Sequence, residues 1–243
     1  MKVGIMQPYV FPYIGYFQLI SYVDKWVVFD DTQYISKGWV NRNRILHPDM
    51  KKKWQYFSVP LRKHSHDCSI KDIEINGDID WKSQLLGKLT SYKKKAPFYM
   101  QTIEFVNECV SVECAMLSEW AVFTLKMTCE YLNIPFDYSI FSKMEMNNSD
   151  IEHAGQWALE IADVVGADEY TNPPAGHGIF KEHEFRERGI ELNFLKPRIE
   201  SYAQGREEFI AGLSIIDIMM WNDKKAINEM LSEYDIVTQS QFK

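Results

Sequence analysis

Apolar and polar positions near the N-terminus change from strand-like to helix-like spacing and back. The apolar run 2–6 ends at a turn that contains Pro8, which is typical of a buried strand. Apolar residues follow at helical spacing over 14–22, and 26–29 is a second apolar run between charged residues. A strand, a helix and a strand within roughly thirty residues predict a right-handed βαβ unit.

Further strands are predicted along the rest of the chain, between turn signals. Asn76-Gly77 is such a signal, and it follows an alternating run that contains Ile70, Ile73 and Ile75. We expect these additional strands over residues 54–61, 69–75, 136–141 and 190–195.

Helical spacing dominates the segment at about 81–132, with an interruption at Ala96-Pro97. Its last part, 114–132, contains neither Gly nor Pro. Ser149 and Glu152 have the spacing of a capping box and predict a helix that runs to Val165. A final helix is expected over 213–221.

Strands and helices alternate without segregating, and the chain has no internal repeat or clear linker. A chain of 243 residues is long enough for one enlarged domain. The sequence therefore predicts a single α/β domain over 1–243, with a Rossmann-like parallel sheet flanked by helices and a helical insertion.

Charge and composition narrow the function classes. A net charge of −7 argues against a general affinity for nucleic acid, because phosphate backbones require a basic surface. The four cysteines lack CxxC spacing, so neither a disulfide framework nor a metal site is indicated. Without a signal-type segment or an apolar run long enough to span a bilayer, we expect a soluble cytoplasmic protein.

The turn after the first strand is the strongest candidate for a binding site. It opens at the carboxyl end of that strand, where parallel sheets bind ligands. The next helix begins near Gly15, so its free N–H groups favour an anion such as phosphate and the glycine allows close backbone approach. A proline-rich turn packed with aromatic rings is the alternative. The residues predicted to contact a ligand here are Gln7, Tyr9, Tyr13, Gly15 and Tyr16.

Two adjacent carboxylates follow the second predicted strand. Asp30 and Asp31 repel each other unless they are exposed, paired or bound to a cation, and the ammonium group of an amino sugar is a suitable partner. Gln33 and Tyr34 extend this candidate site. A solvated Asp-rich turn is the alternative.

The segment 39–44 adds cationic and aromatic groups. Arg42 and Arg44 lie on one side of an extended segment, and each guanidinium can bind a phosphate through two N–H groups. Asn41 lies beside them, and Trp39 is suited to stack on a base or a sugar. Ordinary surface arginines and a packed tryptophan are the alternatives.

The irregular loop 172–178 contains the best candidate base. His177 lies between Gly176 and Gly178, and a neutral imidazole is suited to accept a proton from an attacking amine. Asn172 is a candidate donor to a developing negative charge. A simple surface loop is the alternative.

The segment 11–16, Phe-Pro-Tyr-Ile-Gly-Tyr, resembles the strand-turn opening of nucleotidylyltransferases, where His-x-Gly-His stabilises charge on phosphates. Tyr13 and Tyr16 occupy the histidine positions. Tyrosine donates hydrogen bonds but carries no positive charge at neutral pH. The resemblance therefore implies a nucleotidylyltransferase-like fold and a nucleotide-sized pocket more than adenylyl transfer.

Several motifs together resemble the WbqC-like protein family over nearly the whole chain. They are Gln7-Pro8-Tyr9, residues 11–16, Asp30-Asp31-Thr32-Gln33-Tyr34, residues 39–44, residues 166–170, Ala175-Gly176 and Leu213-Ser214-Ile215-Ile216-Asp217. The resemblance implies a role in bacterial surface-polysaccharide (O-antigen, lipopolysaccharide) biosynthesis.

Residue chemistry and resemblance together favour a transferase that adds an acyl or aminoacyl group to a nucleotide-linked amino sugar. In this reading Asp30 or Asp31 orients the amine, His177 is the base, and Arg42 and Arg44 hold the diphosphate. An acyl or aminoacyl donor is the co-substrate, and no resident cofactor is indicated. A degenerate nucleotidylyltransferase and a non-catalytic nucleotide-sugar binding protein are the alternatives, and a homodimer is left open.

Overall fold

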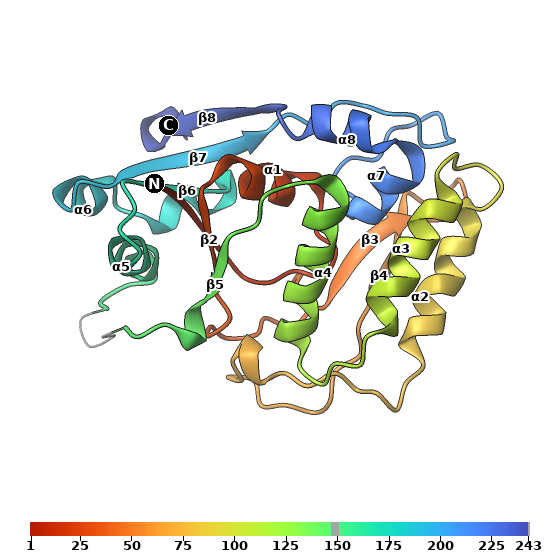
Figure 1. The fold of residues 1–243 in the computed structure, drawn as a ribbon, viewed down its shortest axis with the longest axis horizontal. Coiled ribbons are helices and arrows are strands. Elements are labelled where there is room, and N and C mark those ends of the chain that lie inside the picture. The colour runs from red at the N-terminus through yellow and green to blue at the C-terminus, as the bar shows by residue number, and fades with distance from the viewer. Residues whose placement is uncertain (147–150, 243) are drawn as a thin grey trace.

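The computed structural model describes residues 1–146 and 151–242 of the chain. Its main sheet has six strands, and β8 alone runs antiparallel to its neighbour (Figure 1). In spatial order the strands are β5 (Tyr138–Ile140), β2 (Lys25–Val28), β1 (Lys2–Met6), β6 (Glu169–Asn172), β7 (Glu191–Pro197) and β8 (Tyr234–Thr238). Helices pack on the sheet, which is the predicted α/β Rossmann-like fold.

The predicted βαβ unit forms the centre of this sheet. Strand β1 is followed by α1 (Ile14–Tyr22), and β2 then pairs with β1 in parallel. The chain continues outward to β5 and later returns to the other side of β1 as β6. The strand order therefore reverses between β1 and β6, and open α/β sheets bind ligands at the carboxyl ends of such strands.

Alternating side chains bury both faces of the sheet. Val27 packs in an apolar cluster with α5 (Gln156–Val164) and α6 (Glu182–Glu187). Its neighbours Trp26 and Val28 belong to the larger cluster on the opposite face, together with α1. This alternation is the two-residue period of a strand, so both faces require cover by helices.

A helical layer extends the second face, beside a separate two-stranded hairpin (Figure 1). The predicted helical segment is confirmed and contains α2 (Trp81–Leu89), α3 (Tyr99–Ser111) and α4 (Leu117–Leu132). The hairpin is formed by β3 (Arg42–Leu46) and β4 (Trp54–Ser58), and α7 (Ile215–Trp221) and α8 (Lys224–Met230) complete the layer.

The strand predicted over 69–75 is wrong. Ile70–Asp72 forms a single 3₁₀ turn, although the three isoleucines of this segment are buried as the alternation implied. The backbone N–H of Ile70 donates to Thr32 O, and that of Ile75 donates to Ala115 O. Loops rather than a neighbouring strand satisfy these donors, so no regular ladder forms.

The predicted start of α5 is also wrong. The helix begins at Gln156, whereas the proposed cap Ser149 lies outside the described residues. Gly155 packs so closely on Ile179 that a Cβ atom would lie 2.2 Å from its carbonyl oxygen. This contact fixes the backbone just before the helix. Sequence patterns did not indicate β6, β8, α6 or α8 as regular elements, whereas the extended segment expected to carry Arg42 and Arg44 is β3.

Within the described parts of the chain, no helix is both long enough and apolar enough to cross a membrane. The organisation of 1–243 as one domain stays a prediction.

Candidate functional site

A cavity of about 560 Å³ opens where the strand order reverses. We call it the switch-point cavity. Its walls combine hydrogen-bonding groups with apolar and aromatic side chains, which is the usual composition of a small-molecule site. The lining residues are Ile5, Met6, Gln7, Tyr9, Phe29, Asp31, Thr32, Ala154, Trp157, Ala158, Ile161, Tyr170, Asn172, Ile179 and Phe180.

Asp31 brings the negative charge to this cavity. Its Oδ2 lies 2.9 Å from Lys71 Nζ, and both side chains are about one third exposed to solvent. The hydrogen bond to Asp31 raises the pKa of Lys71, so this ammonium group stays charged at neutral pH. Asp31 keeps further lone pairs with which to accept hydrogen bonds from a ligand.

Asp30 is held away from the switch-point cavity. Its carboxylate is buried, and it accepts hydrogen bonds from the backbone N–H of Ser142 at 2.9 Å and from Ser142 Oγ at 2.6 Å. These bonds fasten the start of a 3₁₀ turn that follows β5. Of the two adjacent aspartates, Asp31 is therefore the one that lines this cavity.

Asn172 lies at the end of β6 with its amide fixed in place. Its Oδ1 accepts a 2.9 Å hydrogen bond from Tyr170 Oη, and its Nδ2 donates to Pro173 O at 2.9 Å. A Cβ on Gly176 would come within 2.2 Å of that nitrogen, so the glycine is required by this packing. The second N–H of the amide is not used by these contacts.

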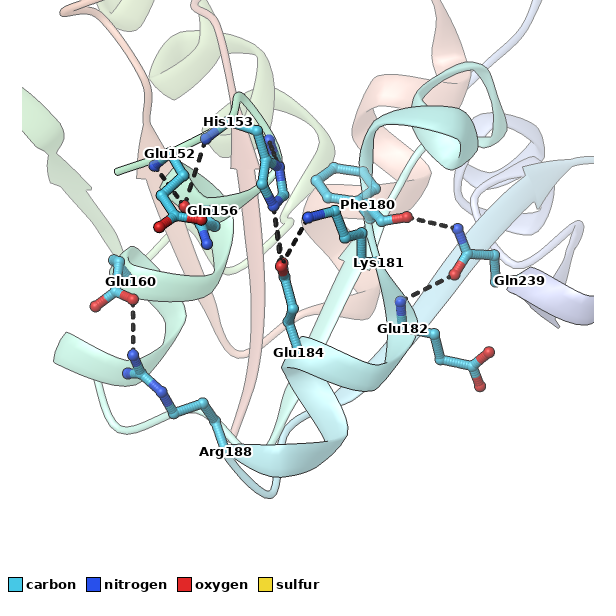
Figure 2. A network of polar contacts seen from close by, with 11 residues as sticks. Glu152, His153, Gln156, Glu160, Phe180, Lys181, Glu182, Glu184, Arg188 and Gln239 are labelled. Carbon is cyan, nitrogen blue, oxygen red and sulfur yellow. Dashed lines mark hydrogen bonds and ion pairs between the residues drawn. The ribbon is translucent and has the colours of Figure 1, made fainter. Parts of the chain in front are cut away.

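A network of polar contacts supports one wall of the switch-point cavity (Figure 2). His153 Nε2 lies 3.0 Å from both carboxylate oxygens of Glu184, and Lys181 Nζ lies 3.1 Å from one of them. The hydrogen bond from His153 lowers the pKa of Glu184. These contacts tie α6 to the segment that carries the wall residue Ala154.

A second cavity of about 230 Å³ lies between the N-terminal turn and the hairpin. We call it the aromatic cavity. Tyr9 lines both cavities and therefore stands between them. The lining residues are Tyr9, Pro12, Tyr13, Trp39, Asn43, Arg44 and Gly212.

Two of the predicted turn residues are enclosed by protein. Tyr16 is fully buried, and its Oη donates a 2.8 Å hydrogen bond to Gln7 O, which fastens the turn to α1. A Cβ on Gly15 would lie 2.4 Å from the Tyr13 ring and 2.7 Å from Pro197. The close approach at Gly15 is therefore made by these two side chains, and contact between a ligand and this glycine stays a prediction.

Four other predicted residues make contacts within the protein. Tyr34 Oη donates to Asn41 Oδ1, and Gln33 Nε2 lies 3.0 Å from His66 Nδ1. Arg42 lies over the Tyr56 ring and donates to main-chain carbonyl oxygens of the preceding loop. None of these residues lines either cavity in the described structure.

His177 lies outside both cavities. Its ring stacks on Phe242 with centroids 4.7 Å apart, and its Nδ1 lies 3.0 Å from Pro174 O. Its neighbours Ile179 and Phe180 do reach the switch-point cavity. The role of His177 as a base stays a prediction.

Comparison with known proteins agrees with the motifs. The WbqC-like protein family matches residues 7–229 of the chain. The chain belongs to this family. It is similar to the uncharacterized protein Rv1507c of Mycobacterium tuberculosis (strain ATCC 25618 / H37Rv), with 27% identity over 232 residues, 90% of this chain and 92% of the relative. No solved structure matches the chain. The nucleotidylyltransferase-like character of the N-terminal unit stays a prediction.

Several cavity residues of this WbqC-like protein were not predicted from its sequence. Thr32 and Phe29 flank the Asp30-Asp31 pair, so their place at the carboxyl end of β2 was a usable signal. Gly212 directly precedes the family motif at 213–217. Trp157 on α5 gave no such signal, because nothing local indicates which strand end α5 covers.

Residues 1–146 and 151–242 contain no group of three or more His, Cys, Asp or Glu side chains placed to hold a metal ion. The side chains that line the two cavities offer amides, phenols, indoles, one aliphatic hydroxyl, one carboxylate and one guanidinium for hydrogen bonding.

Proposed function

We propose that the protein is a transferase that binds a nucleotide-linked amino sugar at the carboxyl edge of its sheet and adds an acyl or aminoacyl group to the sugar nitrogen. The observation that carries this proposal is the switch-point cavity with Asp31, Gln7 and Asn172 on its walls. Aromatic faces beside amide and carboxylate groups are suited to a sugar ring and its amine.

The reaction needs an amine with a free lone pair. Its nitrogen attacks the carbonyl carbon of an activated donor, the bond from that carbon to the leaving group breaks, and the departing leaving group takes up the proton that the nitrogen loses. Asp31 orients the amine through a charge-assisted hydrogen bond, and Asn172 Nδ2 donates to the oxygen that becomes negative.

The biological setting of the proposal comes from the family. The chain's membership of the WbqC-like family is the ground on which we propose surface-polysaccharide biosynthesis, in which nucleotide-linked sugars are the activated building blocks. A cavity with walls suited to a sugar ring agrees with this setting.

Removing the carboxylate from Asp31 tests the proposal. Calorimetric titrations compare nucleotide-linked sugars that differ only in an amine or a hydroxyl at one carbon. We expect wild type to bind the amine form more tightly, and Asp31→Asn to lose that preference by roughly 10- to 100-fold, the effect of one charged hydrogen bond. Equal affinity of wild type for both forms contradicts the proposal.

Asp137→Asn is the matched control for this substitution. Asp137 also pairs with a lysine, Lys25, at 2.7 Å, but it precedes β5 at the opposite edge of the sheet. Asp137→Asn should therefore bind the amine form of the sugar with the same preference as wild type. Product mass then separates the alternatives, because binding without product indicates a binding protein and pyrophosphate release indicates a nucleotidylyltransferase. In that assay His177→Asn should lower turnover if His177 is the base.

A further inference from the structure

Arg44 occupies an unusual position on the hairpin. It pairs with Tyr56 across the two strands, and its guanidinium carbon lies 5.1 Å from the Trp39 ring centre and 5.2 Å from that of Trp54. Two aromatic rings therefore stabilise the cation through their π faces. The guanidinium also lines the aromatic cavity.

The described residues leave this cation without an anionic partner. Its only guanidinium hydrogen bond there runs from Nη2 to Gly212 O at 3.1 Å, and no carboxylate forms an ion pair with it. Its Nε is buried without any hydrogen-bond partner. Arginine has five N–H donors, and leaving them unused in a partly buried site costs free energy.

Other arginines of the chain are satisfied differently. Each member of one set pairs with two carboxylates, and these are Arg62, Arg188 and Arg198. Arg42, two residues before Arg44 on β3, donates to loop carbonyl oxygens instead. Arg44 is thus a cation that has no anionic partner among the described residues.

Hydrogen bonds between distant segments fix the cavity before any ligand arrives. Asn43 Nδ2 and Ser214 Oγ both donate to Phe11 O, at 2.9 and 2.7 Å. The backbone N–H groups of Ser214 and Ile215 donate to Arg44 O and Pro12 O. The N-terminal turn, the hairpin and the start of α7 are therefore held in one arrangement, which lowers the entropic cost of binding.

We propose that the aromatic cavity is an oxyanion subsite, in which Arg44 binds a phosphate or carboxylate group of a ligand. In the nucleotide sugar this group is the diphosphate. The sugar then lies on the other side of Tyr9, in the switch-point cavity. In the acyl or aminoacyl donor it is a second carboxylate, because the activated carboxyl group that is transferred carries no free negative charge. The choice between these sources rests on the proposed function, whereas the subsite itself rests on Arg44.

The remaining walls suit an anion. Burial raises the pKa of Tyr9 and of Tyr13, so both phenols stay neutral and do not repel a negative group. Trp39 is 38% exposed and offers a face on which a base or another planar group can stack.

Titrations with uridine diphosphate, inorganic pyrophosphate and glycine at low salt test the subsite. We expect Arg44→Gln to weaken binding of the anionic probe by tenfold or more, and Arg44→Lys to retain part of the affinity because it keeps the charge but loses the planar fork. Arg62→Gln removes one positive charge outside both cavities and should change affinity less than twofold. Melting temperatures verify that each variant is folded. If Arg44→Gln does not fold, the comparison of wild type with Arg44→Lys tests the subsite.

The outcomes separate this inference from the proposed function. Binding of the diphosphate probes that depends on Arg44 assigns the subsite to the nucleotide, and the same dependence for glycine assigns it to the donor. Because these probes do not require an amine at Asp31, Asp31→Asn should leave diphosphate affinity unchanged. Equal affinity of wild type and Arg44→Gln for all probes, or no binding of any, overturns the subsite.

Discussion

Replacing Phe11 with alanine is expected to lower the free energy of unfolding by about 3–5 kcal/mol, the usual cost of removing a buried phenyl ring. The ring is completely buried and contacts Phe57, Phe105 and Trp120, with centroids 6.4, 6.3 and 5.8 Å away. It therefore joins the N-terminal turn to the hairpin and to the helical layer.

Backbone conformation adds to the importance of Phe11. Its φ of +43° lies in the left-handed region, which costs a non-glycine residue roughly 1–2 kcal/mol. Packing of the ring and the two hydrogen bonds accepted by Phe11 O offset that cost. Alanine keeps the strain and loses the packing.

Urea unfolding of Phe11→Ala measures this effect. Phe136→Ala is the control, because Phe136 is half-buried and stacks mainly on Tyr138. A loss for Phe11→Ala no larger than that for the control would show that the turn is not anchored by this ring.

The second large effect is a pH dependence of stability that originates at Asp217. Its fully buried carboxylate accepts hydrogen bonds from Tyr92 Oη at 2.6 Å, Tyr202 Oη at 2.7 Å and Gln204 Nε2 at 3.1 Å. Burial nevertheless dominates and raises the pKa of Asp217 from 3.8 to about 6.

The sign of the effect follows from proton binding. Between pH 3.8 and about 6 the folded chain holds a proton on Asp217 that the unfolded chain has lost. Stability from this group therefore falls as pH rises through that window and is constant above it. The shift corresponds to roughly 3 kcal/mol.

Asp217→Asn should remove this dependence. We expect the stability of wild type relative to the variant to fall by roughly 2–2.5 kcal/mol between pH 4 and pH 7 in urea unfolding series, while other titrating groups cancel in the difference. Parallel curves for the two proteins would show that the pKa of Asp217 is not raised.

Local patterns predicted the centre of the fold well. The β1–α1–β2 unit is contiguous, and its strands are short apolar runs that are buried on both faces. Strand β3 was expected only as an extended segment, because Arg42, Asn43 and Arg44 make it polar and local sequence does not reveal its hydrogen-bonded pairing with β4. Strand β8 is an edge strand with an exposed Ile236, so its apolar signal is weak.

Partners that are distant in sequence also determine which side chains reach the candidate site. The sequence placed Asp30 and Asp31 at a strand end, but Ser142, 112 residues from Asp30, determines which carboxylate faces the cavity. The Gly-His-Gly segment at 176–178 had the pattern of a catalytic loop. In the structure, however, the ring of Phe242, which is distant in sequence, stacks on His177. Such distant partners cannot be derived from local spacing.

Blocking the switch-point cavity tests the central claim most directly. Ala154 lines this cavity with an exposed side chain, so Ala154→Trp fills the cavity without disturbing the core. Ala115→Trp adds the same ring to an exposed position that lines neither cavity. For a nucleotide-linked amino sugar that binds wild type, calorimetry should give at least a hundredfold loss of affinity in Ala154→Trp and no loss in Ala115→Trp, with both variants folded. Full affinity in Ala154→Trp would contradict the assignment of this cavity as the sugar site.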